Sequence, residues 1–226
     1  MIRVLCAWGL LLWAAGSWSQ EIEVREGVHY AKLPVAVATR DPSKVEVVEV
    51  FSYACPHCRD FDPELEAWRE RQSEAVDFHR VPAVFNATYA TLAQAFYTAE
   101  ALGVADAVHQ PIFHAIHSLG VDLRRTELLA ALFEETAGVA PADFNQMFSS
   151  FAVRGRVQQA DARARAYRVR GVPVLIVDGA YRIDARMAGS YQGMLAITDH
   201  LVAQVAQTKG LDVTPAAAEE PVAEEL

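Results

Sequence analysis

The chain has 226 residues, which is enough for one medium domain or for a core domain with an insertion. Hydrophobic residues make up 52% of it, so the composition is not that of a disordered protein. The formal net charge is −9 at pH 7, and the field of an acidic protein repels nucleic acid and anionic membranes, which excludes both as expected partners.

Residues 1–19 have the layout of a secretory signal peptide. Arg3 precedes an apolar run over 4–15, which ends in a small-x-small pattern. The run is shorter than the roughly 20 apolar residues that span a bilayer. We therefore expect cleavage after Ser19, export, and loss of Cys6, whereas a retained N-terminal anchor is the alternative.

The mature chain then contains only two cysteines, Cys55 and Cys58. A structural disulfide framework normally has more pairs and wider loops. Closing so small a loop would also add little to the free energy of unfolding. A single tight pair in an oxidising compartment therefore suggests redox chemistry.

The first part of the chain predicts an α/β unit. A short strand is expected near 30–33, and the β-branched run 45–51 reads as a strand buried on both faces. A helix follows over 56–70, because Cys58 and the next apolar residues share one stripe at helical spacing. The segment 76–81 reads as a second strand.

The middle of the chain has almost no strand signal. We expect one helix that ends at Gly103. Four further helices are expected over 112–119, 126–136, 143–151 and 153–167. The remaining elements are a β-hairpin over 174–183 with a two-residue turn at Asp178-Gly179, and a helix that begins after Ser190 and ends at Gly210.

This order predicts the fold class α/β, a thioredoxin-like fold with an inserted all-helical domain. The thioredoxin-like domain is discontinuous and covers 20–85 and 171–208. The helical insertion covers 86–170. The remaining 209–226 are rich in Ala, Pro and Glu and are expected to form an acidic disordered tail.

A Cys-x-x-Cys motif alone is a weak signal, because zinc sites also contain it. Here it follows a buried strand and opens a helix, with Pro56 in the first turn. Cys55 would sit at the helix N-terminus, where free N–H groups and the helix dipole stabilise a thiolate. We expect Cys55 to be the exposed attacking thiol and the shielded Cys58 to resolve the mixed disulfide.

His57 lies between the two cysteines. As a cation or an N–H donor it would further stabilise the Cys55 thiolate. That favours the reduced form and makes the disulfide form a stronger oxidant, so we expect the protein to donate its disulfide. The alternative is a solvent-facing residue with no role.

The segment Phe51-Ser52-Tyr53-Ala54-Cys55-Pro56-His57-Cys58, together with Arg170-Gly171-Val172-Pro173, resembles the DsbA family of periplasmic thiol:disulfide interchange proteins. The resemblance runs from about residue 24 to residue 207. It implies a periplasmic oxidase of unfolded or reduced exported proteins, reoxidised by a DsbB-like quinone-linked membrane protein. The redox-active cysteine pair would serve without a separate cofactor.

The resemblance also implies roles for three residues outside the cysteine motif. Pro173 would be cis against the cysteines, and Val172 would pair with the substrate backbone. Glu49 would be a buried acid that transfers protons near Cys58. The family lysine that accompanies this acid has no clear counterpart around 78–80, which leaves the charge pair unsupported.

Other features suggest no separate site. His109, His114 and His117 lie close together, but no Glu or Cys completes a zinc ligand set, and we expect no metal. The arginines between 154 and 170 are expected to form a solvated helix face.

The alternatives to a disulfide donor are a thioredoxin-like reductase or isomerase, a redox-silent peptide-binding chaperone, and a zinc site. Isomerases of this compartment usually carry a separate dimerisation domain, and we expect no room for one before the strand at 45–51. We also expect a monomer.

Overall fold

The computed structural model describes residues 23–214, so the predicted signal peptide and most of the predicted tail lie outside the described residues. Within this part of the chain a five-stranded mixed sheet has the order β1-β5-β4-β2-β3. The strands are β1 (Ala31–Lys32), β2 (Val45–Phe51), β3 (Val76–Pro82), β4 (Val174–Val177) and β5 (Tyr181–Asp184).

Strand β2 lies inside the sheet, and all seven of its residues are buried, as the sequence predicts. It pairs in parallel with β3 and antiparallel with β4. Because both faces of β2 are covered, its two acids, Glu46 and Glu49, must find partners inside the protein.

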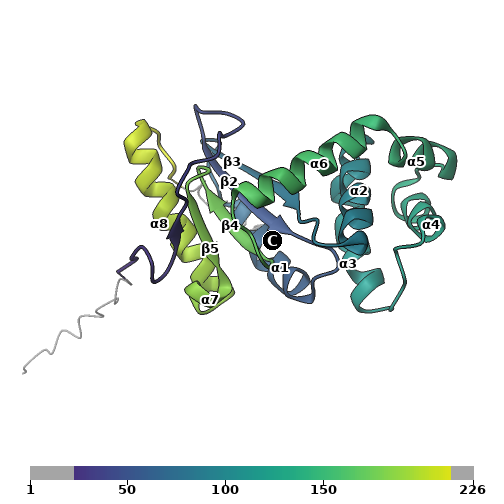
Figure 1. Cartoon of the computed structure of the whole chain (residues 1–226), viewed down its shortest axis with the longest axis horizontal. Helices are drawn as coiled ribbons and strands as arrows, with labels where there is room; N and C mark the ends of the chain where they lie inside the picture. Colours follow the sequence, from purple (N-terminus) through teal and green to yellow (C-terminus); the bar gives the residue numbers. More distant parts are fainter. Residues whose placement is uncertain (1–22, 215–226) are drawn as a thin grey trace, which may run out of the picture.

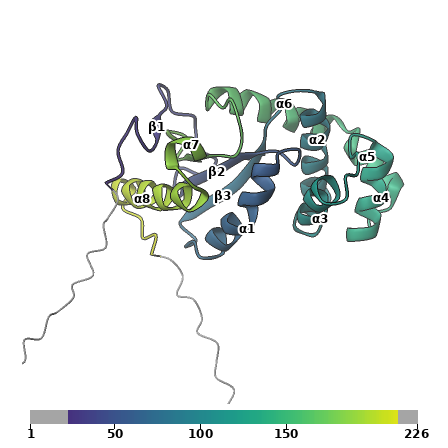
Figure 2. The same cartoon turned by 90° about the horizontal axis from the view of Figure 1, so that it is seen from below.

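Helices cover both faces of the sheet (Figure 2). On one face, Phe61, Leu65 and Trp68 of α1 share a hydrophobic core with α8, whereas α6 packs on the other face. The helices are α1 (Pro56–Glu70), α2 (Ala87–Ala101), α3 (Ala105–His117), α4 (Thr126–Ala137), α5 (Pro141–Phe148), α6 (Phe151–Ala166), α7 (Ala185–Ala188) and α8 (Tyr191–Lys209).

The helices α2–α5 form a separate group beside the sheet, and α6 leads the chain back to it (Figure 1). All of them lie between β3 and β4, which confirms the predicted α/β class with inserted helices. The predicted helix 143–151 is wrong at its end, because α5 stops at Phe148. Ser150 instead caps the next helix by accepting a hydrogen bond from the backbone N–H of Val153.

The predicted hairpin turn needs a correction in its register. Asp178 and Gly179 both have positive φ angles, 48° and 62°, as a type I′ turn requires. However, Val177 pairs with Tyr181, so Ala180 is an extra loop residue. Its carbonyl accepts the N–H of Leu33, which extends the contact between the N-terminal segment and β5.

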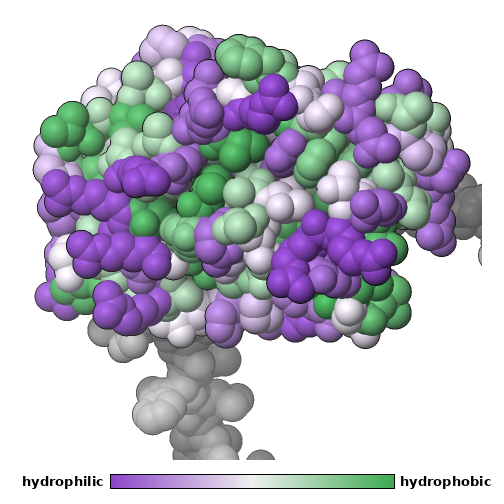
Figure 3. Space-filling model, turned by 45° about the vertical axis from the view of Figure 1, so that its right-hand side comes forward, coloured by the Kyte–Doolittle hydropathy of each residue, from purple (hydrophilic) through white to green (hydrophobic). Residues whose placement is uncertain are grey.

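The surface has mixed polarity. Figure 3 shows one face on which apolar side chains gather near the centre and hydrophilic side chains border them. Among residues 23–214, no helix is both long enough and apolar enough to cross a membrane.

Candidate active site

The two cysteines lie where β2 passes into α1. Cys55 has extended backbone angles and is the N-cap of α1, and Pro56 occupies the first helical turn. The backbone N–H groups of Cys58 and Arg59 donate to the Cys55 carbonyl. The Cys55 side chain therefore lies at the positive end of the helix, as predicted.

The electrostatic surroundings favour a Cys55 thiolate. The largest effect is the hydrogen bond from the Cys58 thiol, which lowers the pKa of Cys55, whereas burial raises it. Hydrogen bonds from the backbone N–H groups of Cys58 and His57 lower the pKa further. The charge of His57 contributes least of these. Together they lower the pKa of Cys55 to about 6.

Cys55 is less exposed than the sequence suggests, which corrects the prediction of an exposed thiol. Only 7% of its surface is accessible. The segment before β4 covers it, with a cis peptide bond between Val172 and Pro173. The Cys55 Sγ lies 3.4 Å from the Val172 carbonyl oxygen, to which the protonated thiol donates.

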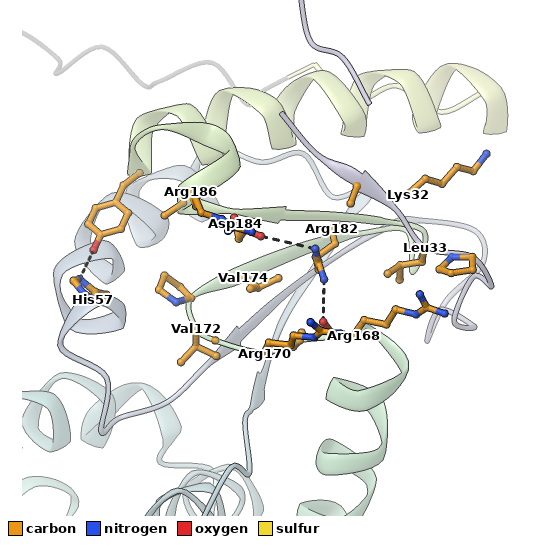
Figure 4. A pocket seen from close by; sticks show the side chains of 17 residues that line it. Lys32, Leu33, His57, Arg168, Arg170, Val172, Val174, Arg182, Asp184 and Arg186 are labelled. Atoms are coloured by element: carbon orange, nitrogen blue, oxygen red, sulfur yellow. Dashed lines mark hydrogen bonds and ion pairs between the residues drawn. The ribbon is translucent and has the colours of Figure 1, made fainter. Parts of the chain in front are cut away.

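Both residues of the Pro56-His57 insert are exposed. The His57 Nδ1 lies 3.4 Å from the Tyr191 hydroxyl at the start of α8, so the imidazole leans toward α8 (Figure 4). The structure therefore places His57 at the mouth of the site, where an approaching molecule can reach it.

Cys58 is fully buried on the same stripe of α1 as Phe61 and Trp68. Burial raises the pKa of its thiol far above the ordinary range, and its hydrogen bond to Cys55 and the negative charge of Glu49 raise it further. The two thiols thus differ in the direction that disulfide exchange requires: one is acidic, and the other stays protonated until a base assists it.

Glu49 is paired, contrary to the doubt raised by the sequence. Its Oε2 accepts a hydrogen bond of 2.8 Å from the Nε of Arg80, which stands opposite Glu49 in the β2–β3 register. An arginine therefore stands where the family resemblance implies a lysine, and it supplies the cation that pairs with the acid. Burial nevertheless raises the pKa of Glu49 to about 7. The charge of Arg80 lowers this pKa but offsets only part of the effect of burial, and the negative charges of Asp62 and Glu66 raise the pKa further.

A buried polar network continues from Arg80, and we call Glu49, Arg80, Asp62, His109 and Tyr53 the buried network. Arg80 donates to Asp62 at 2.9 Å and also to Glu66. The His109 Nε2 lies 2.9 Å from Asp62, and the His109 Nδ1 lies 2.9 Å from the Tyr53 hydroxyl. Because an ionised Asp62 can only accept, His109 must carry a proton on Nε2.

The sequence pattern does not predict the places of Asp62, Arg80 and His109 in the buried network. A signal for Asp62 was present, because it lies four residues after Cys58 and therefore shares the buried face of α1. His109 comes from α3, and only the fold brings the two elements together. The histidine cluster does not assemble a metal site: His109 belongs to the buried network, and His117 bonds the Tyr53 carbonyl.

Glu46, Asp77 and His79 are close enough to hold a metal ion together. However, the guanidinium of Arg163 binds Glu46 and that of Arg40 binds Asp77. Two cations already neutralise these acids, so this cluster is an ion-pair network on the far side of β2 rather than a metal centre.

A groove with a volume of about 740 Å³ opens beside the cysteines (Figure 4). One wall is the segment 168–174, and the other consists of β1, β5 and α7. His57 and Val172 line the end of the groove that is next to Cys55. None of the aromatic residues Tyr53, Phe85, Phe96 and Tyr97 lines this groove: Phe85 is 45% exposed, and the other three belong to the core.

Comparison with known proteins shows the family to which the chain belongs. A family model described as the DSBA-like thioredoxin domain matches residues 69–196. The thiol:disulfide interchange protein DsbA of Azotobacter vinelandii is 38% identical over 199 residues, which cover 87% of this chain and 92% of that protein. The DsbA of Pseudomonas aeruginosa PAO1 is 37% identical over 187 residues, covering 83% and 88%.

Solved structures give the same relation. The crystal structure of Pseudomonas aeruginosa DsbA superposes with a TM-score of 0.78 at 36% identity, over 81% of this chain and 95% of that one. DsbA from Xylella fastidiosa has a TM-score of 0.75 at 36% identity, over 79% and 96%. The thioredoxin-like fold is therefore confirmed, and the chain belongs to the DsbA family of thiol:disulfide oxidoreductases.

Proposed function

We propose that this protein is a disulfide donor for exported proteins, and that the Cys55–Cys58 disulfide is transferred through a mixed disulfide. The observation that carries the proposal is the difference between the two thiols: the pKa of Cys55 is lowered to about 6, whereas that of Cys58 is raised. A stabilised thiolate favours the reduced form, and the disulfide form is then the stronger oxidant.

The transfer has two steps with balanced electrons. A client thiolate attacks the Cys55 sulfur, which forms a Cys55–client disulfide and leaves Cys58 as a thiolate that takes up a proton. A second client thiolate then attacks the client sulfur, which forms the client disulfide and releases the Cys55 thiolate. The client loses two electrons, and the protein gains them as its dithiol.

Because the pKa of the Cys58 thiol is raised, the Cys58 thiolate needs a nearby proton donor, and Glu49 can supply the proton. The Cys58 sulfur is buried, so the proton that it needs must come from a buried group. Glu49 has a pKa of about 7 and is close enough for its charge to act on Cys58. We assign Glu49 the exchange of this proton, Val172 the pairing with the client backbone, and Pro56, His57 and Pro173 the shaping of the approach to Cys55.

The place of this reaction and its partners also belong to the proposal. An exported chain with a signal peptide would work in the periplasm. Each turnover leaves a dithiol, so a membrane oxidant similar to DsbB, linked to quinone, would restore the disulfide. No other cofactor is required, because the cysteine pair carries both electrons.

The test is the redox equilibrium of the pair against a glutathione series, together with urea unfolding of both forms. A strongly oxidising potential, with the reduced form more stable than the disulfide form, is expected. A potential near that of thioredoxin would contradict donation and favour a reductase.

Trapping tests the assignment of the two thiols. We expect Cys55→Ala to abolish client oxidation. Cys58→Ala is first treated with oxidised glutathione, which converts Cys55 to a mixed disulfide with glutathione. Attack of a reduced client on the Cys55 sulfur then releases glutathione, and the Cys55–client disulfide should accumulate and be detectable on non-reducing gels. If Cys58→Ala traps nothing while the wild type oxidises the same clients, the attacking and resolving roles are assigned wrongly. A redox-silent chaperone would bind clients equally well without either thiol.

A further inference from the structure

The groove beside Cys55 is cationic in a chain whose net charge is −9. Its walls carry five lysine and arginine residues and only one acid, Asp184. The cations come from both walls (Figure 4). They are Lys32 on β1, Arg168 and Arg170 before β4, Arg182 on β5 and Arg186 on α7.

Most of this positive charge has no partner among the residues that the structure describes. Asp184 lies 3.9 Å from Arg182, and it also accepts the N–H of Met187 as the cap of α7. None of the other four cations forms an ion pair with any residue in 23–214. All four are exposed, so their charge faces the solvent of the groove.

The floor of the groove differs from its walls. Leu33 and Val174 line it and are buried, with 6% and 4% of their surfaces accessible. Val172 lies beside them at the end where Cys55 is reached. The groove thus offers an apolar floor and cationic walls, and one of its lining residues, Val172, contacts the Cys55 sulfur.

One of the groove cations, Arg168, has a backbone conformation that is unusual for arginine. Arg168 has a φ of 56°, in the left-handed region that favours glycine. Its carbonyl accepts a hydrogen bond of 2.9 Å from Arg182, which ties the two walls together. An arginine therefore stands at a position where glycine would be less strained.

We propose that this groove selects client segments in which acidic residues flank the cysteine that is oxidised. The occupant is an extended stretch of client polypeptide whose carboxylates lie between the two cationic walls. Charge complementarity carries the argument, because the local charge is opposite to that of the whole protein. This inference rests on the proposed disulfide transfer and adds the substrate class.

The test uses three dithiol peptides of equal length, in which three residues on each side of the first cysteine are aspartate, asparagine or lysine. The second-order rate constant for peptide oxidation is measured with the oxidised full-length protein in low salt. We expect the aspartate peptide to react about five to ten times faster than the lysine peptide, since each exposed pair contributes a small factor. The difference should vanish in 1 M salt, where the Debye length is about 3 Å.

The variant Arg168→Glu/Arg170→Glu tests the residues themselves. For each peptide, the ratio of variant to wild-type rate cancels the intrinsic reactivity of that peptide. We expect this ratio to be lower for the aspartate peptide than for the lysine peptide. The matched control is Arg125→Glu/Arg154→Glu, which changes the net charge equally at two exposed arginines that do not line the groove, one at the N-cap of α4 and one on α6. It should leave all three ratios near one.

The outcomes separate the two proposals. If the wild type oxidises none of the peptides, the proposed function fails. If it oxidises all three at equal rates, or if the control double variant changes the preference as much as the groove variant, the inference fails and the function stands. A preference that appears only after deletion of 215–226 would show that the acidic tail, rather than a client, occupies the groove.

Discussion

The arginine of the buried network and the arginines of the groove differ in how their charges are paired. Arg80, with a side chain that is 12% exposed, contacts three carboxylates. The exposed Arg170, at the groove, contacts none among the described residues. A guanidinium taken out of water must be paired, whereas one left in water keeps its charge available for a partner. The same residue type thus holds the site together on one side and offers a binding surface on the other.

Loss of Arg80 should have the largest effect on stability. Arg80→Leu leaves Glu49 and Asp62 buried without their cation, and we expect a loss of about 3–5 kcal/mol in the free energy of unfolding. Urea unfolding at pH 7 measures it. The control is Arg69→Leu, which removes a largely exposed partner of Glu66 and should cost below about 1 kcal/mol. Equal losses in both variants would contradict the importance of burial.

Loss of His109 should have a smaller effect. His109→Phe removes the partner that the Tyr53 hydroxyl has in the buried network and one of the two donors to Asp62 Oδ1, which keeps its bond from Arg80; this should cost about 1–3 kcal/mol. The exposed His114 on the same helix provides the control His114→Phe, for which we expect a change within about 0.5 kcal/mol. A stability for His109→Phe equal to that of the wild type would mean that the network is not coupled to folding.

Glu49→Gln should change the pH dependence more than the stability. The carboxylate of Glu49 forms as the pH rises through about 7, so a step that needs Glu49 as a base, such as attack by Cys58, should accelerate over that range. The measurement is the release of a peptide from its mixed disulfide with Cys55, followed from pH 5.5 to 8.5. Glu49→Gln should remove the inflection near 7, and the control Glu70→Gln at the exposed end of α1 should keep it. An unchanged profile in Glu49→Gln would remove Glu49 from the proton pathway.

Arg186→Gln should have the smallest effect on stability. Arg186 is exposed and has no ion pair among residues 23–214, so we expect a change within about 0.5 kcal/mol by urea unfolding. Arg163→Gln should cost more, because Arg163 pairs with the buried Glu46. A large loss in Arg186→Gln would mean that the groove cations support the fold and are not reserved for a ligand.

Several parts of the fold follow from local pattern alone. The buried strand β2, the Cys-x-x-Cys helix and the caps at Ser190 and Gly210 are all read correctly, because each depends on near neighbours in the chain. The wrong boundary at Phe148 has a local cause as well. Two helices separated by a short break show continuous helical spacing, and the Ser150 cap is the only sign of the break.

The charge partner of Glu49 shows where pattern reading stops. Arg80 is thirty-one residues away, and only the parallel register of β2 and β3 places it opposite the acid. The resemblance implies a lysine around 78–80, and Arg80 within this range supplies the positive charge instead. His109 is still more remote, since its approach to Asp62 depends on how α3 packs against α1.

The sequence by itself determined the sheet, the position of both cysteines and their division into an acidic helix-end thiol and a shielded one. These depend on periodicity and on the helix terminus, which act over a few residues. Only the tertiary structure decided that Cys55 lies under Val172, that Arg80 neutralises Glu49, and that four cations without an ion pair to any residue in 23–214 meet around one groove. Burial and charge pairing join residues far apart in the chain, so they exist only once the fold has brought those residues together.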